Sequence, residues 1–116
     1  MKRKRKIFIS GRITGDPNYV EKFYQAEKRL KSSYDVVNPC YLQFWGLPLV
    51  CYSWRTCMMV CLWNLVKCST VYMLEDWKES RGARIEHKVA KLFRKKMIYQ
   101  GEGNFGPIKR IAFSKL

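Results

Sequence analysis

The apolar positions of this chain fall into short unbroken runs separated by longer stretches with helical spacing. The runs are rich in Ile, Val, Tyr and Met and are bounded by glycine, proline or polar residues, which is typical of buried strands. The predicted strands are Lys6–Ser10, Asp35–Pro39, Thr70–Leu74 and Met97–Tyr99, with Ile108–Phe113 as a fifth. Thr70–Leu74 lacks polar alternation, so we expect a sheet that is covered on both faces.

Three helices are predicted between the strands. Residues 18–32 place apolar side chains at helical spacing after Asp16–Pro17, a favourable helix entry. Ser53–Lys67 is apolar almost all round, which indicates deep burial or a subunit interface, and Gly82–Lys95 is amphipathic. Residues 40–52 are predicted to be a loop whose aromatic side chains either pack between subunits, the interpretation we favour, or stack a base.

Strands that alternate with helices predict βαβ units and a mostly parallel sheet, and therefore an α/β fold. The chain has 116 residues, 47% of them hydrophobic, which suits one domain at residues 7–116 behind a basic tail at residues 1–6. In open parallel sheets, ligands bind beyond the carboxyl ends of the strands. Because Gly11–Gly15 and Asp76–Gly82 both follow predicted strands, we expect these two loops to form one crevice.

The charge of the chain favours an anionic partner, because 23 basic residues oppose 9 acidic ones and give a net charge of +14. Arg84, Lys88, Lys91 and Lys95 recur at helical spacing and form a basic stripe on the last predicted helix. A solvated face and tail is the ordinary interpretation of such a pattern. Contact with nucleic acid is the alternative, although the chain has no zinc-finger spacing and no aromatic ribonucleoprotein motif.

Cysteine use and hydropathy predict a reduced, cytoplasmic protein. No apolar run approaches the ~20 residues that cross a membrane, and Ile7–Ile9 is too short for the core of a signal peptide. Five cysteines are an odd number, so we expect free thiols. We expect no metal and no cofactor, because there is no CxxC pair and His87 is the single histidine.

Glu86 is the candidate catalytic residue. At about 100° per residue, its side chain shares one helical face with Val89, Ala90 and Phe93. A carboxylate among such neighbours is poorly solvated and, when ionised, suits a nucleophile. A structural glutamate paired with a lysine or arginine is the alternative.

Candidate substrate-binding residues flank this glutamate. Ser80 is expected either to cap the last helix or, together with the first amides of that helix, to hold a phosphate. Gly82 lies at the mouth of the same helix. In the first loop, Gly11 lets backbone N–H groups approach an anion, and Arg12 and Thr14 add donors.

Four motifs occur in order along the chain, namely Ile7–Gly15, Val37–Pro39, Cys68–Leu74 and a Ser-x-Gly-x-x-x-Glu element at residues 80–86. Over residues 6–99 they resemble the nucleoside 2-deoxyribosyltransferase-like superfamily, in particular its small bacterial and phage relatives of unknown function. The resemblance implies a flavodoxin-like three-layer sandwich with a four- to five-stranded, mostly parallel sheet. It also implies a homo-oligomer of two or more subunits, in which a neighbour completes the site.

The resemblance further implies cleavage of the N-glycosidic bond of a nucleoside or nucleotide. Glu86 would attack the anomeric carbon of the sugar, and water or a second base would resolve the covalent intermediate. A serine at position 80 is typical of the relatives that hydrolyse 2'-deoxynucleoside 5'-monophosphates, whereas transferases acting on free nucleosides typically have an aspartate there.

Two positions differ from the active relatives. Phe8 stands in place of a tyrosine, and Cys61 in place of an aspartate that assists the departing base. Asp76 or Glu79 in the adjacent loop could supply the proton instead. The sequence therefore leaves three hypotheses: an N-glycosidase of nucleoside 5'-monophosphates, a catalytically silent nucleotide-binding protein, and a basic nucleic-acid-binding protein.

Overall fold

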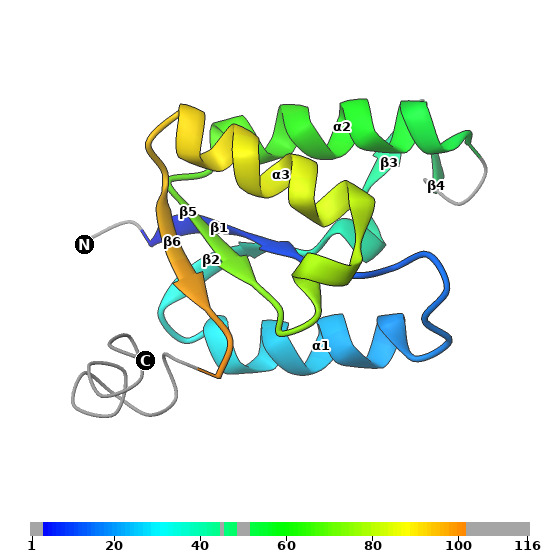
Figure 1. The fold of residues 1–116 in the computed structure, drawn as a ribbon. Helices are drawn as coiled ribbons and strands as arrows, with labels where there is room; N and C mark the ends of the chain where they lie inside the picture. Colours follow the sequence, from blue (N-terminus) through cyan, green and yellow to red (C-terminus); the bar gives the residue numbers. More distant parts are fainter. Residues whose placement is uncertain (1–3, 45, 49–51, 102–116) are drawn as a thin grey trace.

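The computed structural model describes residues 4–44, 46–48 and 52–101. Within this part, one sheet is formed by β1 (Arg5–Ser10), β2 (Tyr34–Val37), β5 (Thr70–Met73) and β6 (Lys96–Tyr99). The strands lie in the order β2-β1-β5-β6, and every neighbouring pair is parallel (Figure 1). The four predicted strands and the parallel sheet are thus confirmed, and the predicted fifth strand lies outside the described residues.

Three helices cover the two faces of the sheet. α1 (Tyr19–Leu30) lies on one face, whereas α2 (Trp54–Lys67) and α3 (Arg81–Leu92) lie side by side on the other (Figure 1). The chain reverses its direction along the sheet after β2, because β1 pairs with both β2 and β5. Right-handed crossovers then place α1 opposite the other two helices. The result is the three-layer, flavodoxin-like α/β fold that we expected.

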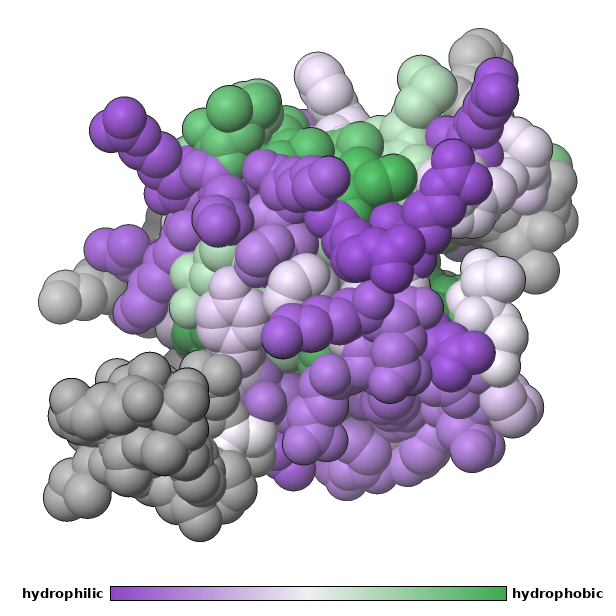
Figure 2. Space-filling view, viewed as in Figure 1, coloured by the Kyte–Doolittle hydropathy of each residue, from purple (hydrophilic) through white to green (hydrophobic). Residues whose placement is uncertain are grey.

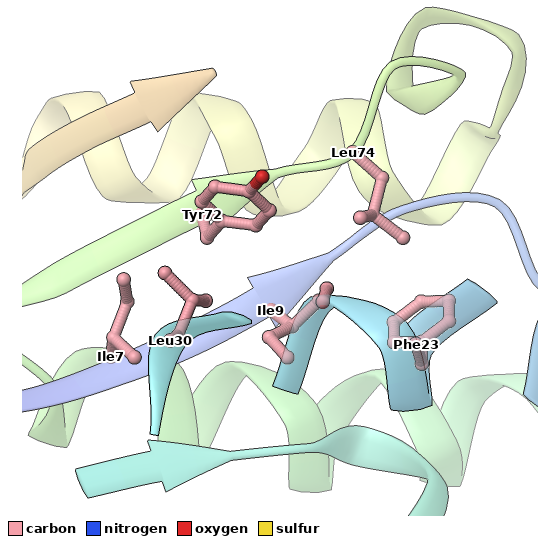
Figure 3. Packing of buried hydrophobic residues seen from close by; sticks show 7 residues of the cluster. Ile7, Ile9, Phe23, Leu30, Tyr72 and Leu74 are labelled. Carbon is pink, nitrogen blue, oxygen red and sulfur yellow. The ribbon is translucent and has the colours of Figure 1, made fainter. Parts of the chain in front are cut away.

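Alternate side chains of β1 enter two separate cores. Ile7 and Ile9 point toward α1 and pack with the buried side chains of that helix (Figure 3). Phe8 points the other way and packs in the second core with Cys61 of α2. Because side-chain direction alternates along a strand, Ser10 faces α2 and α3, as Phe8 does.

The segment before α2 is more regular than the loop that we predicted. Asn38 caps a short 3-10 helix, η1 (Pro39–Tyr41). β3 (Gln43–Phe44) and β4 (Leu47–Pro48) then pair as an antiparallel hairpin. β2 accordingly ends before Asn38, whereas the predicted strand continued to the proline.

The last helix is shorter than predicted. α3 ends at Leu92, and Arg94 adopts a φ of 58°, a left-handed conformation that stops the helical path. Lys95 therefore leaves the predicted stripe, and its Nζ donates a hydrogen bond to the Val66 carbonyl oxygen at 2.7 Å.

The outer surface of α2 and α3 carries apolar side chains. Figure 2 shows hydrophilic residues over most of the visible face and hydrophobic residues gathered over these two helices. The exposed large hydrophobic residues of the two helices are Trp54, Met59, Trp63 and Leu92. On α2 only Cys61 and Leu65 are buried, so the predicted deep burial of this helix is wrong for the single chain. No helix in the described part of the chain is long and apolar enough to cross a membrane.

Candidate functional site

A pocket of about 400 Å³ lies beyond the carboxyl ends of β1 and β5, bordered by the first turns of α2 and α3. The chain reverses direction along the sheet at this point, which is the usual ligand position in open α/β folds. Five of the predicted site residues line the pocket, namely Gly11, Thr14, Ser80, Gly82 and Glu86. Arg12 is not among the described lining residues.

Glu86 of α3 forms a buried part of the pocket wall. The residue is 6% exposed, and its Oε1 accepts a hydrogen bond from Ser10 Oγ at 2.5 Å. Burial raises the pKa of Glu86 from 4.5 to about 7, while the hydrogen bond from Ser10 acts in the opposite direction. Among the described residues, no lysine or arginine forms a salt bridge with this carboxylate. The structure therefore disfavours the alternative of a glutamate paired with a base.

Ser10 is a site residue that the sequence analysis missed. We predicted it only as the end of a strand, yet it is 1% exposed and is hydrogen-bonded to Glu86. The alternation of side chains along a strand could have predicted its position, because Ser10 lies two residues after Phe8 and therefore on the same face of β1. Phe8 has no hydroxyl, but Ser10 supplies one to Glu86 from the next position on the same face of β1.

The N-terminus of α3 forms a second part of the wall. Ser80 Oγ accepts a hydrogen bond from the Ala83 N–H at 3.1 Å, which confirms the predicted N-cap. The N–H groups of Arg81 and Gly82 have no acceptor within the helix, because no carbonyl oxygen precedes them there. The Arg81 guanidinium carbon lies 4.7 Å from the centroid of the Trp54 ring, which also lines the pocket. These groups give the pocket a positive end.

The loop after β1 fits tightly against the strand beside it. A Cβ at Gly11 would lie 2.5 Å from Leu74 Cδ1, and Gly15 has a φ of 83°, so both positions require glycine. The Arg12 N–H donates a hydrogen bond to Asp76, whereas Arg12 Nη1 lies 3.6 Å from Glu79 Oε1. The backbone of Arg12 therefore holds the loop, and its side chain is engaged away from the pocket.

Lys22 joins the two loops that border the pocket. Its Nζ forms ion pairs with Asp16 and Asp76, and it donates a hydrogen bond to the Arg12 carbonyl oxygen at 3.1 Å. The hydrogen bond from Lys22 lowers the pKa of the Asp16 carboxyl. Asp76 is paired with Lys22, Glu79 Oε1 lies 3.6 Å from Arg12 Nη1, and neither residue is among the described residues that line the pocket. The proton-donating role that we consider for them stays a prediction.

Sulfur-containing and aromatic side chains form the apolar wall. They come from η1, from the segment just before α2, and from α1 and α2 themselves, and they are Cys40, Tyr52, Tyr19, Phe23, Trp54, Cys57, Met58 and Cys61. Burial, and secondarily the Glu86 charge, raises the pKa of the Cys61 thiol well above its ordinary value. Cys61 therefore stays a neutral thiol at physiological pH. Of the aromatic residues in the predicted loop at residues 40–52, Tyr52 lines the pocket and Trp45 lies outside the described residues. Packing of this loop between subunits, the interpretation that we favour, stays a prediction.

The remaining candidate chemistry lies outside this pocket. His87 Nε2 lies 2.8 Å from Tyr99 Oη, and the His87 ring stacks on Trp77 with a centroid distance of 4.0 Å. No group of three His, Cys, Asp or Glu side chains within the described residues is arranged to hold a metal ion. Among the described residues that line the pocket, Glu86 is the only one with a carboxylate.

A comparison with family models matches residues 5–99 to a family described as "Domain of unknown function (DUF4406)". No curated protein matches the chain. The matched segment extends from β1 to β6 and includes every pocket residue discussed above. The chain therefore belongs to the DUF4406 family, a family of unknown function.

Proposed function

We propose that this protein hydrolyses the N-glycosidic bond of a nucleoside 5'-monophosphate, with Glu86 as the nucleophile. The proposal rests on the buried carboxylate of Glu86, which lies in the wall of a pocket at the switch point of the sheet. Among the described residues, no lysine or arginine forms a salt bridge with it. The pocket volume of about 400 Å³ lies within the range for small-molecule sites, roughly 300–1,000 Å³. The family resemblance of the sequence motifs points to the same chemistry.

In the first step, an electron pair of Glu86 Oε2 forms a bond to the anomeric carbon, and the bond from that carbon to the base nitrogen breaks. The base leaves with the electron pair of the broken carbon–nitrogen bond and takes a proton from water. Water then attacks the same carbon, the ester bond to Glu86 breaks, and the released proton returns to solvent. The net reaction consumes one water and gives free base and sugar phosphate, by the two-step logic of retaining glycoside hydrolysis.

Ser10 positions the nucleophile in this scheme. Its hydroxyl engages Oε1 of Glu86 and leaves Oε2 for attack. With a pKa of about 7, Glu86 is ionised in a substantial fraction of molecules at neutral pH, and its burial keeps the anion poorly solvated. Cys61, a neutral thiol, is a weak proton donor beside it, and the lost general-acid help corresponds to about 10²–10⁴ in rate. We therefore expect slow turnover.

The positive end of the pocket suits the 5'-phosphate. Ser80 Oγ lines the pocket, and the first N–H groups of the twelve-residue helix α3 carry the positive end of its dipole. Arg81 adds a full charge at the same end. Tyr52 also lines the pocket and offers an aromatic ring on which a base stacks favourably, whereas Trp54 lies at the positive end beneath the Arg81 guanidinium.

Free-base release, measured by chromatography on a panel of nucleosides and their 5'-monophosphates, tests the proposal. We expect release from monophosphates by the wild type and none above background by Glu86→Gln. Glu79→Gln is the matched control, because it removes the same charge from an exposed side chain that pairs with Arg12. A Glu86→Gln protein that releases base as fast as the wild type would refute the assignment of the nucleophile.

A catalytically silent nucleotide-binding protein is the second candidate, and Phe8 and Cys61 favour it. Both residues are buried together in the core beside Glu86, where the resemblance leads us to expect a tyrosine and an aspartate. Isothermal titration calorimetry separates the two candidates. Micromolar binding of a monophosphate without release of base from any substrate would support binding alone.

A further inference from the structure

A second hollow, of about 970 Å³, is lined by residues at the amino ends of β1, β2 and β5 and at the carboxyl ends of α1 and α2. These ends of the strands and helices lie together on the left side of Figure 1. We call this second hollow the basic hollow. Its charged lining residues are five basic ones, Lys4, Arg5, Lys6, Lys31 and Lys67, and two acidic ones, Glu27 and Asp35. Three separate segments thus bring positive charge to one place, and only two carboxylates oppose it.

Helix ends explain part of this charge. Lysines near a helix C-terminus complement its exposed carbonyl oxygens, and Lys4 Nζ donates a hydrogen bond to the Lys31 carbonyl oxygen at 2.9 Å. This contact uses the ammonium of Lys4. It leaves the ammonium groups of Lys31 and Lys67, both on exposed residues, to face a partner.

The basic hollow is separate from the candidate active site. The two lie at opposite ends of β1, whose six residues span roughly 20 Å at about 3.3 Å per residue. A ligand in one does not occupy the other. The basic hollow is also wide and open, and its positive charges lie at the ends of long, flexible side chains. A ligand with several phosphates in a row can therefore contact more of these charges than one small anion can.

An exposed aromatic side chain lies beside these charges. Trp63 is 64% exposed, and Lys67, one helical turn later on α2, places its Nζ 5.2 Å from the centroid of the Trp63 ring. Tyr34 lines the basic hollow itself. Proteins that bind single-stranded nucleic acids combine positive charges along the phosphate backbone with aromatic rings on which the bases stack.

We propose that the basic hollow and Trp63 form a binding surface for single-stranded nucleic acid. Lys31 and Lys67 contact phosphates, and a base stacks on Trp63. The surface differs from the predicted stripe on α3, since it combines the amino edge of the sheet with the last turn of α2. It acts independently of the nucleotide pocket.

Fluorescence anisotropy of the full chain with a labelled oligo(dT) strand of about 20 nucleotides tests this proposal, with salt varied from about 50 to about 200 mM. The test variant is Lys31→Glu/Lys67→Glu. The matched control is Lys88→Glu/Lys91→Glu on exposed positions of α3, because each pair lowers the net charge from +14 by four. Circular dichroism verifies the fold, and Lys31→Gln/Lys67→Gln serves as a milder second variant.

We expect the test variant to bind at least about tenfold more weakly. Its slope of log K against log salt should become less negative by about 1.4, because each of the two lost phosphate contacts accounts for about 0.7. The control should change affinity less than about threefold. Trp63→Ala should lose at least about fivefold, and Trp63→Tyr should retain most of the affinity. Equal losses in both charge variants, or binding to phosphatidylserine vesicles without binding to the oligonucleotide, would overturn the proposal.

Discussion

Replacing Glu86 by glutamine should stabilise the fold at alkaline pH and leave it unchanged at acid pH. Glutamine keeps the size of the side chain and an oxygen that accepts the Ser10 hydrogen bond, but it has no charge to desolvate. The size of the effect follows from the pKa of Glu86, which burial raises from 4.5 to about 7. At about 1.4 kcal/mol per tenfold change in proton affinity, this displacement corresponds to about 3 kcal/mol.

The sign of the pH dependence is set by proton binding. Below pH 4.5, both the folded and the unfolded chain carry the proton on Glu86, and the fold is not penalised. Between pH 4.5 and about 7, the unfolded chain has lost the proton while the folded chain retains it, so the free energy of unfolding falls as pH rises. Above about pH 7 the ionised carboxylate is buried, and the full loss of about 3 kcal/mol is reached.

Urea unfolding of wild type and Glu86→Gln across this pH range measures the difference directly. Subtracting the two curves removes the contribution of every other titrating group. The difference should grow by about 3 kcal/mol in favour of the variant, whereas Glu79→Gln, at an exposed position, should show no such growth. A difference that stays constant with pH would show that the Glu86 carboxylate is solvated, and the argument for a poorly solvated nucleophile would fail with it.

Three further substitutions test other parts of the structure. Ser10→Ala removes the hydrogen bond that lowers the pKa of Glu86, so the pH profile of base release, or the carboxyl titration followed by NMR, should move to higher pH. Gly11→Ala should lower the free energy of unfolding by about 1–3 kcal/mol in urea melts, because its Cβ would lie 2.5 Å from Leu74 Cδ1. Phe23→Ala empties part of the core under α1 and should cost about 3–5 kcal/mol in the same assay; a loss below 1 kcal/mol would mean that the core collapses around the gap.

Hydrophobic patterning was sufficient for the main fold. The four described strands contain apolar runs that end at glycine, proline or polar residues, and in the two central strands, β1 and β5, burial on both faces is what leaves the run unbroken. The hairpin of β3 and β4 was missed because its strands have two residues each, too few to show an alternation. The exposure of Met59 and Trp63 on α2 could not be predicted either, since an apolar helix has the same sequence whether it faces the core or another chain.

The sequence predicted those residues of the site whose positions depend on a single helix. Helical spacing placed Glu86 on the buried face of α3, and the N-cap preference of serine placed Ser80. The contacts that join distant segments carried no local signal. Lys22 reaches Asp76 across 54 positions, and Ser10 reaches Glu86 across 76, so neither pair stands out in a chain examined segment by segment.

The cysteines around the pocket bear on how this protein tolerates oxidants and alkylating reagents. Such reagents attack the thiolate, and burial holds the pKa of Cys40 at about 11, that of Cys61 higher still, and that of Cys57 above its ordinary value. Thiols of this kind react slowly even when a reagent can enter. We therefore expect the pocket to keep its shape under oxidising conditions, although thiols line its wall.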